Sequence, residues 1–586
     1  MRTQILSSLV LQHFNEISEA PDAVPRLRRF ILDLAVRGKL VEQAPGDEPA
    51  GALLKRIEAE RHKFFKAGAG KRTKPQPPIS DEEIPIPYAQ NVVFARLSAV
   101  ARIEKGTIGI QKANPGRFPL VSLAEARASC DEYQFDTKAA IIPLISSTGH
   151  GHASIKRLHY QEGQFALANI LCAVIPFAPQ IVSARFLYEY FYAYKEQLLV
   201  SKMIGTANVS LTIGKIAEAP VPIISPAAQN RMYELMALCD ELETARTQRE
   251  TRRDRLVAST LHGLNNGDAA PSSATRPSFK ETARFYFNHL PQLTTRPEHI
   301  KQLRQTILNL AVRGKLVAQD PRDEPASVLL ARIKEAKRQL LKGSVDRRIE
   351  PTAGPAPVVP LGWSAVRFEQ LLLALQTGPF GSALHQSDYE AGGAPVVNPA
   401  SIQAGRIIPI DKMAVGKTSL ARLAAFKLRE GDVVMARRGE MGRCAVITER
   451  EAGWLCGTGS LILRFTEDIL PSFIVAMMSA PQTRNYLAGS SVGSTMQNLN
   501  QAILRKMVTG LPPLSEQQRI VAKVNALMSL CDKFEAQLKR AAANRRSVFE
   551  SILREALCGY QTTPFVRGMN QIDSDSMMDL QVPAHE

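Results

Sequence analysis

The 586-residue chain carries 73 Lys and Arg residues against 56 Asp and Glu, a net charge of +17 that favours a polyanionic partner such as nucleic acid; a basic soluble protein without one is the alternative. Its seven cysteines form no Cys-x-x-Cys pair, which argues against a disulfide framework and a zinc site and for a reducing cytoplasm. The longest apolar stretch, 165–182, is broken by Pro176 and Pro179, so no membrane span is expected. The short apolar run at the N-terminus soon turns acidic and lacks a small-residue cleavage site, so no signal peptide is expected.

The first element in chain order is a predicted helical hairpin over residues 1–65. Its first helix has an apolar stripe at helical spacing, and Gly38 supplies the left-handed residue that commonly ends a helix. Pro49 suits the first turn of the second helix, with Asp47 and Glu48 near its positive end. The stripe consists of Leu27, Phe30, Ile31, Leu34 and Ala35.

This hairpin occurs twice. Residues 27–57 match residues 303–333 at a constant offset of 276, with 22 of the 31 positions identical. A second, shorter motif is also repeated, once in the closing part of each half, as LMALCD over 235–240 and as LMSLCD over 527–532. The chain therefore predicts an internal pseudo-two-fold repeat, a dimer imitated within one polypeptide. Such a repeat suits a partner with two similar halves that carry different information.

Between the helical copies lie two blocks, 88–222 and 361–513, with short β-like runs and Gly-rich turns. We predict a mixed α/β domain from each. The blocks differ far more from each other than the helical copies do, although each carries an early Gly-x-x-Gly. Soft or Pro-rich segments flank them: 66–87 and 343–360 are predicted linkers, 265–342 a linker with the central hairpin, and 559–586 a flexible tail. Gly205 and Gly493 each precede, by 24 residues, a glutamine at the start of a helix, Gln229 and Gln517.

Each block is followed by a long predicted helix, 223–264 and 514–558. The second has a heptad seam at Ile520, Val524, Leu527, Cys531, Phe534 and Leu538, and the first a shorter one at Met232, Leu235, Cys239 and Leu242. We predict that the two helices pack antiparallel as a rigid coiled-coil spacer between the blocks; the alternative is that each seam packs on its own domain. The residues predicted to bind partners are Leu235, Leu242, Ile520, Val524, Leu527 and Phe534.

Several runs of the sequence resemble a known family. The runs LNLAVRGKLVAQDPRDEPASVLLARI and LPPLSEQQRIVAKVNALMSLCDKFEAQL, with the duplicated layout, are similar to the DNA-specificity subunit of type I restriction–modification enzymes. The first block resembles one type of target recognition domain through SCDEYQF and IIPLISSTGHGHASIKRLHYQEGQFALANILCAVIP. The other block resembles a different type through TGPFGSALHQSDY and GDVVMARRGEMGRCAVI. A full hairpin before the first block departs from the commonest layout of the family.

The resemblance implies an α+β fold with two target recognition domains separated by long helices. Each domain would read one half of a bipartite, asymmetric site in double-stranded DNA. The helices would set the gap between the halves and hold two methyltransferase subunits, and restriction/translocase subunits would join for cleavage. The chain itself would be noncatalytic and hold no cofactor, whereas S-adenosylmethionine, Mg and ATP would belong to the partner subunits.

The candidate DNA contacts come from polar or basic residues in Gly-rich loops. Arg437 and Arg438 stand at a predicted hairpin tip, where a guanidinium can bond guanine O6 and N7 or a phosphate; a solvated tip is the alternative. The amides near residue 500 suit adenine, or else cap the next element. The candidates are Ser147, Thr148, His150, His152, Lys156, Asn208 and Ser210 in the first block, and Gly378, Ser382, His385, Arg437, Arg438, Gln497, Asn498 and Asn500 in the second. His150 and His152 lack the further ligands that a metal site needs.

No catalytic motif emerges. Asn398-Pro-Ala is the nearest string to an amino-methyltransferase motif and lacks the second proline and the aromatic residue. Gly416-Lys-Thr418 has Asp411 where a phosphate-binding loop needs glycine. Two other functions stay open: a stand-alone DNA methyltransferase or nuclease with an unrecognised site, and a single-chain pseudo-dimeric DNA-binding regulator.

Overall fold

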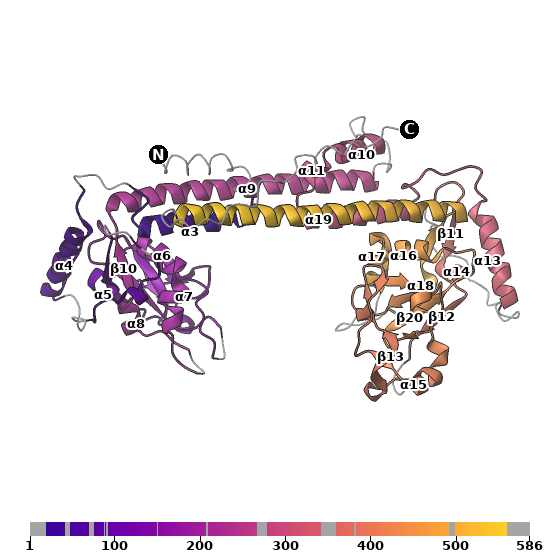
Figure 1. Cartoon of the computed structure of the whole chain (residues 1–586), viewed down its shortest axis with the longest axis horizontal. Helices are drawn as coiled ribbons and strands as arrows, with labels where there is room; N and C mark the ends of the chain where they lie inside the picture. The colour runs from indigo at the N-terminus through magenta and orange to yellow at the C-terminus, as the bar shows by residue number, and fades with distance from the viewer. Residues whose placement is uncertain are drawn as a thin grey trace. The chain divides into compact units, whose positions relative to one another are not determined.

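The computed structural model describes residues 19–20, 22–41, 47–68, 76–86, 88, 92–148, 151–206, 209–266, 278–340, 359–379, 383–490 and 499–558. The chain forms two compact units. The first consists of residues 1–248 and 542–586, and the second of residues 249–541. Two long helices, α9 (Pro226–Asn266) and α19 (Leu514–Cys558), each contribute residues to both units (Figure 1).

Each copy of the repeat contains two helices where the sequence predicts a helical hairpin. They are α3 (Ala23–Val36) with α4 (Ala50–Lys66) in the first unit, and α12 (Pro297–Val312) with α13 (Ala326–Leu340) in the second. Gly38 and Gly314 end the first helix of each pair with φ of 69° and 66°, a left-handed conformation that glycine adopts without steric cost. Two further helices, α10 (Phe279–Asn288) and α11 (Leu290–Leu293), precede α12.

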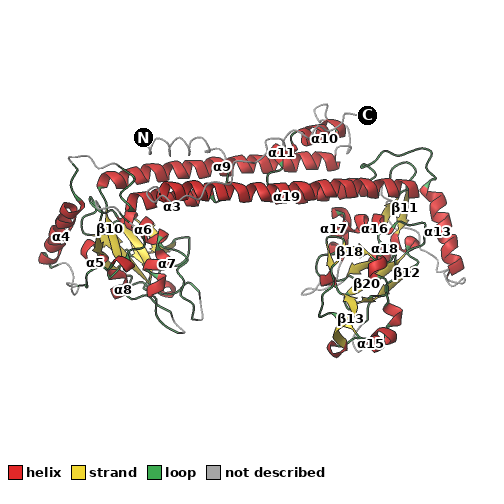
Figure 2. Cartoon of the chain, in the orientation of Figure 1, coloured by secondary structure: helices red, strands yellow, loops and turns green. Residues whose placement is uncertain are grey.

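The head of the first unit, residues 92–223, contains one strand pair and two four-stranded sheets (Figure 2). The pair is β1–β10, and the sheets have the orders β2-β9-β6-β7 and β4-β3-β8-β5. The strands are β1 (Val93–Arg96), β2 (Ala101–Lys105), β3 (Phe118–Val121), β4 (Ala128–Cys130), β5 (Phe135–Asp136), β6 (Ala139–Pro143), β7 (His159–Gln161), β8 (Gln164–Leu167), β9 (Leu171–Pro176) and β10 (Pro220–Ile223). The helices are α5 (Leu97–Val100), α6 (Ala184–Ala193), α7 (Lys195–Leu198) and α8 (Ile213–Ala217).

The head of the second unit, residues 359–511, contains the pair β11–β21, a sheet of order β12-β20-β17-β18, a sheet of order β16-β13-β19 and the pair β14–β15. The strands are β11 (Ser364–Arg367), β12 (Ala374–Thr377), β13 (Tyr389–Val397), β14 (Ile402–Gln403), β15 (Arg406–Ile407), β16 (Ala414–Val415), β17 (Val433–Ala436), β18 (Cys444–Val446), β19 (Leu455–Cys456), β20 (Ser460–Arg464) and β21 (Val508–Leu511). The helices are α14 (Phe368–Leu371), α15 (Lys417–Arg422), α16 (Pro471–Ser479), α17 (Pro481–Ser490) and α18 (Gln501–Lys506).

The two heads share one topology despite their different sequences. In each head the first and last strands of the head form one antiparallel pair, β1 with β10 and β11 with β21. Each head also has a four-stranded sheet whose strands, taken in chain order, lie side by side in the order first, last, second and third. In the other sheet, β3 pairs in parallel with β8 as β13 does with β19. A glycine after the first strand of the four-stranded sheet donates its N–H to a backbone carbonyl in both heads, Gly106 to Leu171 and Gly378 to Ser460. The repeat therefore extends from the helices into the heads.

Each head sits on helices that make the same ion pairs twice. Arg28 of α3 pairs with Asp240 and Glu243 of α9 in the first unit. Arg304 of α12 pairs with Asp532 and Glu535 of α19 in the second, with N–O distances of 2.7 and 2.9 Å. The positions of Arg28 and Arg304 differ by 276 residues, the offset of the repeat, so the two copies share these ion pairs as well as their sequence.

One arginine fixes the segment that leads into the first head. Arg96 at the end of β1 is buried and forms a two-pronged pair with Glu83, with N–O distances of 2.6 and 2.9 Å. It also donates to the carbonyls of Pro77, Pro78 and Glu218. Residues 76–83 are therefore held against the strand pair β1–β10.

This ion pair predicts a pH-dependent stability of the first unit. Hydrogen bonding from Arg96 lowers the pKa of Glu83 from 4.5 to about 2. A lowered carboxyl pKa stabilises the folded state above the unfolded value, and that gain disappears as pH falls from about 4.5 to about 2. Glu83→Gln should therefore cost about 2 kcal/mol at pH 7, after a discount for solvent, and almost nothing at pH 2. Urea unfolding at both pH values tests this; an equal cost at both would contradict it.

Candidate functional site

Three segments of the second head meet at the base of its predicted recognition loops. Two hydrogen bonds of 3.0 Å join Leu499 and Arg437. The backbone N–H of Leu499 donates to the Arg437 carbonyl, and Nε of the Arg437 side chain donates to the Leu499 carbonyl. Gln501 donates from Nε2 to Thr377 Oγ1 at 2.9 Å, which ties the start of α18 to the end of β12. The structure thus brings Gly378, Arg437, Arg438 and Asn500 into one region, as a shared site requires.

The two tip arginines of this region differ. β17 and β18 form the predicted antiparallel hairpin, and residues 437–443 connect them. The Arg437 side chain turns back onto Leu499 and is half-buried, and this burial, with the nearby charge of Arg438, lowers the pKa of its guanidinium. Arg438 is exposed. The sequence expectation that the turn presents both side chains therefore holds for Arg438 and needs correction for Arg437, which also positions the loop.

Other predicted residues of the second head have identifiable local roles. Asn500 caps α18, its Oδ1 accepting from the Ile503 N–H at 3.0 Å, so the capping alternative describes this residue. A Cβ at Gly378 would lie 2.2 Å from the Gly457 carbonyl oxygen, so only glycine fits there. The backbone N–H of the exposed His385 donates to Asp388 at 2.8 Å. Ser382, Gln497 and Asn498 lie outside the described residues.

In the first head the structure joins the two polar stretches predicted to contact DNA. The Ser146 N–H donates to the Val209 carbonyl at 2.9 Å, and the Leu211 N–H donates to the Leu144 carbonyl at 2.8 Å. Ser210 forms a bridge with Ile145, and a Cβ at Gly151 would lie 2.6 Å from the Thr206 carbonyl. The loop after β6 therefore lies against the segment before α8.

Two polar side chains of this loop form hydrogen bonds within the loop. Ser147 Oγ accepts from the Lys156 N–H at 3.0 Å, and Thr148 Oγ1 donates to the His152 carbonyl at 3.3 Å. The side chains of His152 and Lys156 are exposed, whereas Ser147 and Thr148 are half-buried. His150 and Asn208 lie outside the described residues.

The two candidate regions occupy the same place in the shared topology; the sequence indicates that stretch 206–212 matches stretch 494–500, but not that the two hairpin loops are equivalent. The β6–β7 loop of the first head corresponds to the β17–β18 loop of the second, and each is tied to the segment before a short helix capped by Thr212 or Asn500. The signal available in the sequence was the 288-residue offset shared by the Gly205/Gly493 and Gln229/Gln517 pairs. Gln501, which ties α18 to β12, was also missed, because its partner lies 124 residues away.

The paired glutamines at the starts of the long helices join helix to head. Gln229 donates from Nε2 to the Ile181 carbonyl at 2.6 Å and accepts from the Ser183 N–H at 3.2 Å, at the start of α6. Gln517 likewise donates to the Pro512 carbonyl and accepts from the Leu470 N–H, both at 3.1 Å, at the start of α16. Both side chains are buried. In each unit these hydrogen bonds therefore join the start of the long helix, α9 or α19, to the start of an earlier head helix, α6 or α16.

Gln517→Leu should consequently destabilise the second unit by about 2–4 kcal/mol, because it leaves a buried N–H and a buried carbonyl without partners. The neighbouring Gln518 is exposed, so Gln518→Leu is the matched control and should have little effect. Chemical unfolding followed by hydrogen exchange in each unit measures both changes. Equal stability of the two variants would refute the role of the Gln517 side chain.

The seam residues predicted to bind partners lie against the cores of their own units. Ile520 and Val524 are buried in the core of the second unit, and Leu527 and Phe534 are half-buried against it. Leu235 and Leu242 are half-buried against the core of the first unit. These residues therefore pack within their own units, and Ile520 and Val524 in particular are too deeply buried to contact a partner.

Among the described residues, no group of three or more His, Cys, Asp or Glu side chains is placed to hold a metal ion. Nor does any helix within the described ranges have both the length and the apolar character to cross a bilayer. What the heads present are polar and basic loops fixed at their base, an arrangement suited to binding.

Comparison with known proteins identifies relatives over most of the chain. Residues 362–543 match the family model described as the type I restriction modification DNA specificity domain. The EcoEI specificity subunit of Escherichia coli is 28% identical over 91% of this chain and 94% of its own length, and the EcoAI specificity subunit is 26% identical over the same shares. A solved chain from a type I R-M system is 16% identical and covers 80% of this chain and 97% of its own, with a TM-score of 0.44. The sequence matches confirm the predicted resemblance.

Proposed function

Because this chain is related along most of its length to type I restriction specificity subunits, we propose that it reads a bipartite, asymmetric site in double-stranded DNA for a modification and restriction complex. Each head would read one half-site through its two tied loops. The chain contributes recognition and assembly and no catalysis. S-adenosylmethionine, Mg and ATP would be held by the methyltransferase and the restriction/translocase subunits.

The observation that carries this proposal is the contrast between a shared frame and different loops. Both heads have the same sheet order and the same tie between hairpin and capped helix. The hairpin of the first head carries Ser147, Thr148 and His152, whereas that of the second carries Arg437 and Arg438. Because side-chain chemistry in the loops determines which base edges are bonded, one frame with two loop sets suits two different half-sites.

Selection from randomised duplex DNA tests the proposal. The chain, coexpressed with its methyltransferase subunit, should enrich two different short motifs at a fixed gap. Enrichment of no motif, or of a single continuous one, would contradict the proposal. Activity of the chain alone with S-adenosylmethionine would instead favour the stand-alone enzyme.

Two exposed leucines support the docking of two copies of one partner. Leu238 on α9 is 56% exposed and Leu530 on α19 is 59% exposed, and each directly precedes a buried cysteine and an ion-paired aspartate. A single exposed leucine needs no explanation. The same leucine at the same place in both units gives a repeated apolar contact, which fits two methyltransferase subunits, one for each unit.

Leu530→Asp should therefore reduce the number of bound methyltransferase subunits from two to one, and Leu238→Asp should do the same at the other position. Asn525 is exposed about 140° around the helix from Leu530, so Asn525→Asp is the matched control. Mass determination of the purified complexes gives the stoichiometry. Two bound subunits in the Leu530 variant would show that this leucine is not a docking point.

A reducing compartment such as the cytoplasm suits this protein. Cys130, Cys172, Cys239, Cys444, Cys456 and Cys531 are all buried and unpaired. Burial raises the pKa of the Cys172, Cys444 and Cys456 thiols to about 12 in each, so these thiols stay protonated and unreactive. They serve as small core residues.

A further inference from the structure

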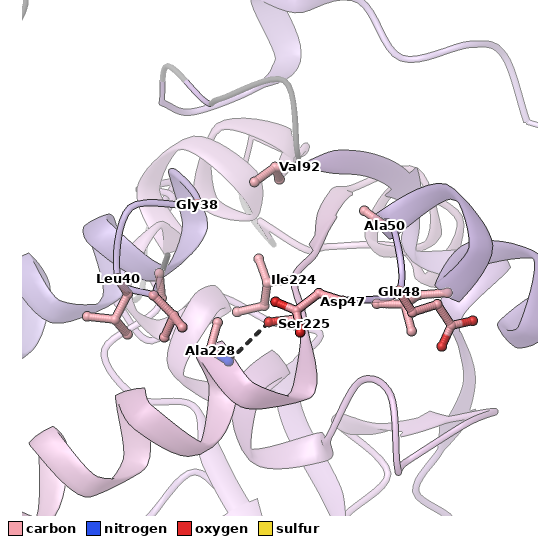
Figure 3. A pocket seen from close by; sticks show the side chains of 12 residues that line it. Gly38, Leu40, Asp47, Glu48, Ala50, Val92, Ile224, Ser225 and Ala228 are labelled. Atoms are coloured by element: carbon pink, nitrogen blue, oxygen red, sulfur yellow. Dashed lines mark hydrogen bonds between the residues drawn. The ribbon is translucent and has the colours of Figure 1, made fainter. Parts of the chain in front are cut away.

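The first unit contains a cavity of about 40 Å³ beside Gly38, where α3 ends and α9 begins (Figure 3). A space of this size holds a few water molecules and excludes an aromatic ring or a nucleobase. The cavity therefore offers no site for a base, and recognition by the first head depends on the exposed faces of its loops.

Three short segments of the first head form a small antiparallel ribbon centred on Ser210. Ser210 pairs with Ile145 on one side and with Ile204 on the other. Ile204 and Ser210 donate their backbone N–H groups to each other's carbonyls, both at 2.9 Å. Hydrogen bonds of 2.8 and 2.9 Å between residues 144–146 and residues 209–211 hold the other pair. The backbone of the ribbon is therefore fixed on both sides of Ser210.

The two faces of this ribbon differ in their surroundings. Successive residues of a strand point to opposite faces, whereas residues paired across strands point to the same face. The residues that alternate with Ile204 and Ser210 are buried in the core of the first unit: Met203, Val209 and Leu211. Ile145, Ser210 and Ile204 therefore form one row on the face away from that core. Ile204 is 60% exposed, and the other two are half-buried.

In the shared topology of the heads, Ile145 corresponds to Arg438. The Leu144 N–H donates to the residue that precedes β9, as the Arg437 N–H donates to the residue that precedes β20. The Leu144 carbonyl accepts from the residue before the cap of α8, as the Arg437 carbonyl accepts from the residue before the cap of α18. Leu144 and Arg437 thus occupy equivalent positions, and so do the residues that follow them.

The two heads therefore present different chemistry at the same place. An arginine suits guanine, which offers two acceptors in the major groove, whereas an isoleucine side chain has no group that can hydrogen-bond a base. The apolar group that a base offers in that groove is the C5-methyl of thymine, and O4 of the same base is an acceptor beside it. A row of two isoleucines around a serine hydroxyl matches this pair of groups.

We propose that the first head reads a thymine in the major groove, with the C5-methyl group packed against Ile204 and Ile145 and with O4 accepting a hydrogen bond from the Ser210 hydroxyl. This inference rests on the proposed function and specifies the chemistry of the first half-site. A single exposed isoleucine needs no explanation. Ile204 differs because its backbone is fixed beside a candidate DNA contact, at the place where the other head presents an arginine.

Exchange of thymine for uracil tests the inference, because it removes the C5-methyl group and leaves O4 and base pairing unchanged. In the complex with the methyltransferase subunits, uracil at one thymine of the site should weaken wild-type binding about fourfold, the effect of one buried methyl group. Ile204→Ala should weaken binding to the thymine duplex at least as much and should show no further loss with uracil. Ile145→Val should reduce the uracil effect in part. Competition between duplexes with each thymine replaced in turn measures these ratios.

Val328→Ala is the matched control, because it truncates a β-branched side chain that is 46% exposed on α13 of the second unit. Its response to uracil should equal that of the wild type. A wild-type complex that binds its site specifically but tolerates uracil at every thymine would overturn the inference, and so would an Ile204→Ala variant that retains the full uracil effect. A complex that prefers no duplex over random DNA would refute the proposed function instead.

Discussion

Arg438→Ala is expected to weaken recognition of one half of the DNA site by about 1–3 kcal/mol and to leave the other half unaffected. Arg438 is exposed at the tip of the β17–β18 hairpin, which is tied at its base to Leu499. An arginine in such a fixed loop can bond guanine O6 and N7 with two donors. Binding to DNA duplexes with one half-site scrambled at a time measures the effect.

Two comparisons separate base reading from charge. Arg322→Ala removes an equally cationic side chain that is 89% exposed on the hairpin connection of the same unit, and should change neither half-site. Arg437→Ala should also weaken recognition, but with lower stability of the second unit, because it removes the Nε bond to Leu499. Equal losses on specific and on random DNA for Arg438→Ala would show that this residue contributes charge alone.

Phe549→Ala is expected to destabilise the first unit by about 3–5 kcal/mol, although residue 549 lies far beyond the sequence of that head. Phe549 and Ile552 of α19 are buried against Ala20 and Ala23 at the start of α3. Arg26 adds an ion pair to Glu550 at 2.8 Å. The C-terminal end of α19 therefore forms part of the apolar core that packs against α3. Loss of the Phe549 ring leaves a cavity in that core.

Val548→Ala is the matched control, since Val548 is exposed and should tolerate truncation. Hydrogen exchange resolved by unit measures both variants, and the second unit should keep its protection in each. Loss of protection in the second unit alone, or no loss anywhere in Phe549→Ala, would contradict this packing.

The helical parts of the fold could be predicted from sequence because their signals are local. The stripe from Leu27 to Ala35 and the glycine at 38 determine a helix and its end within a few residues. The sequences of the two heads predict their strand pairings less clearly, because the strands are short and each pairing joins residues far apart in the chain. Ala374 pairs with Arg464, and Ala101 with Pro176. A common topology can therefore persist after sequence similarity has disappeared.

The candidate site shows the same division. The hairpin around Arg437 was predictable from its alternating apolar strands and glycines. The inward turn of Arg437 was not, because its acceptor is a backbone carbonyl 62 residues away. Heptad spacing identified the seam through Ile520 and Val524, yet spacing alone cannot distinguish a partner from the chain's own core. The exposed Leu238 and Leu530 emerge only when burial is known.

A genome-wide map of methylated adenines, in cells that carry this chain with its methyltransferase subunit, tests the central claim most directly. Two heads with one frame and different loops predict a single motif made of two unlike halves separated by a gap of fixed length. Arg438→Ala should relax one half of that motif only. A continuous or palindromic motif, or one that Arg438→Ala degrades equally in both halves, would contradict the account.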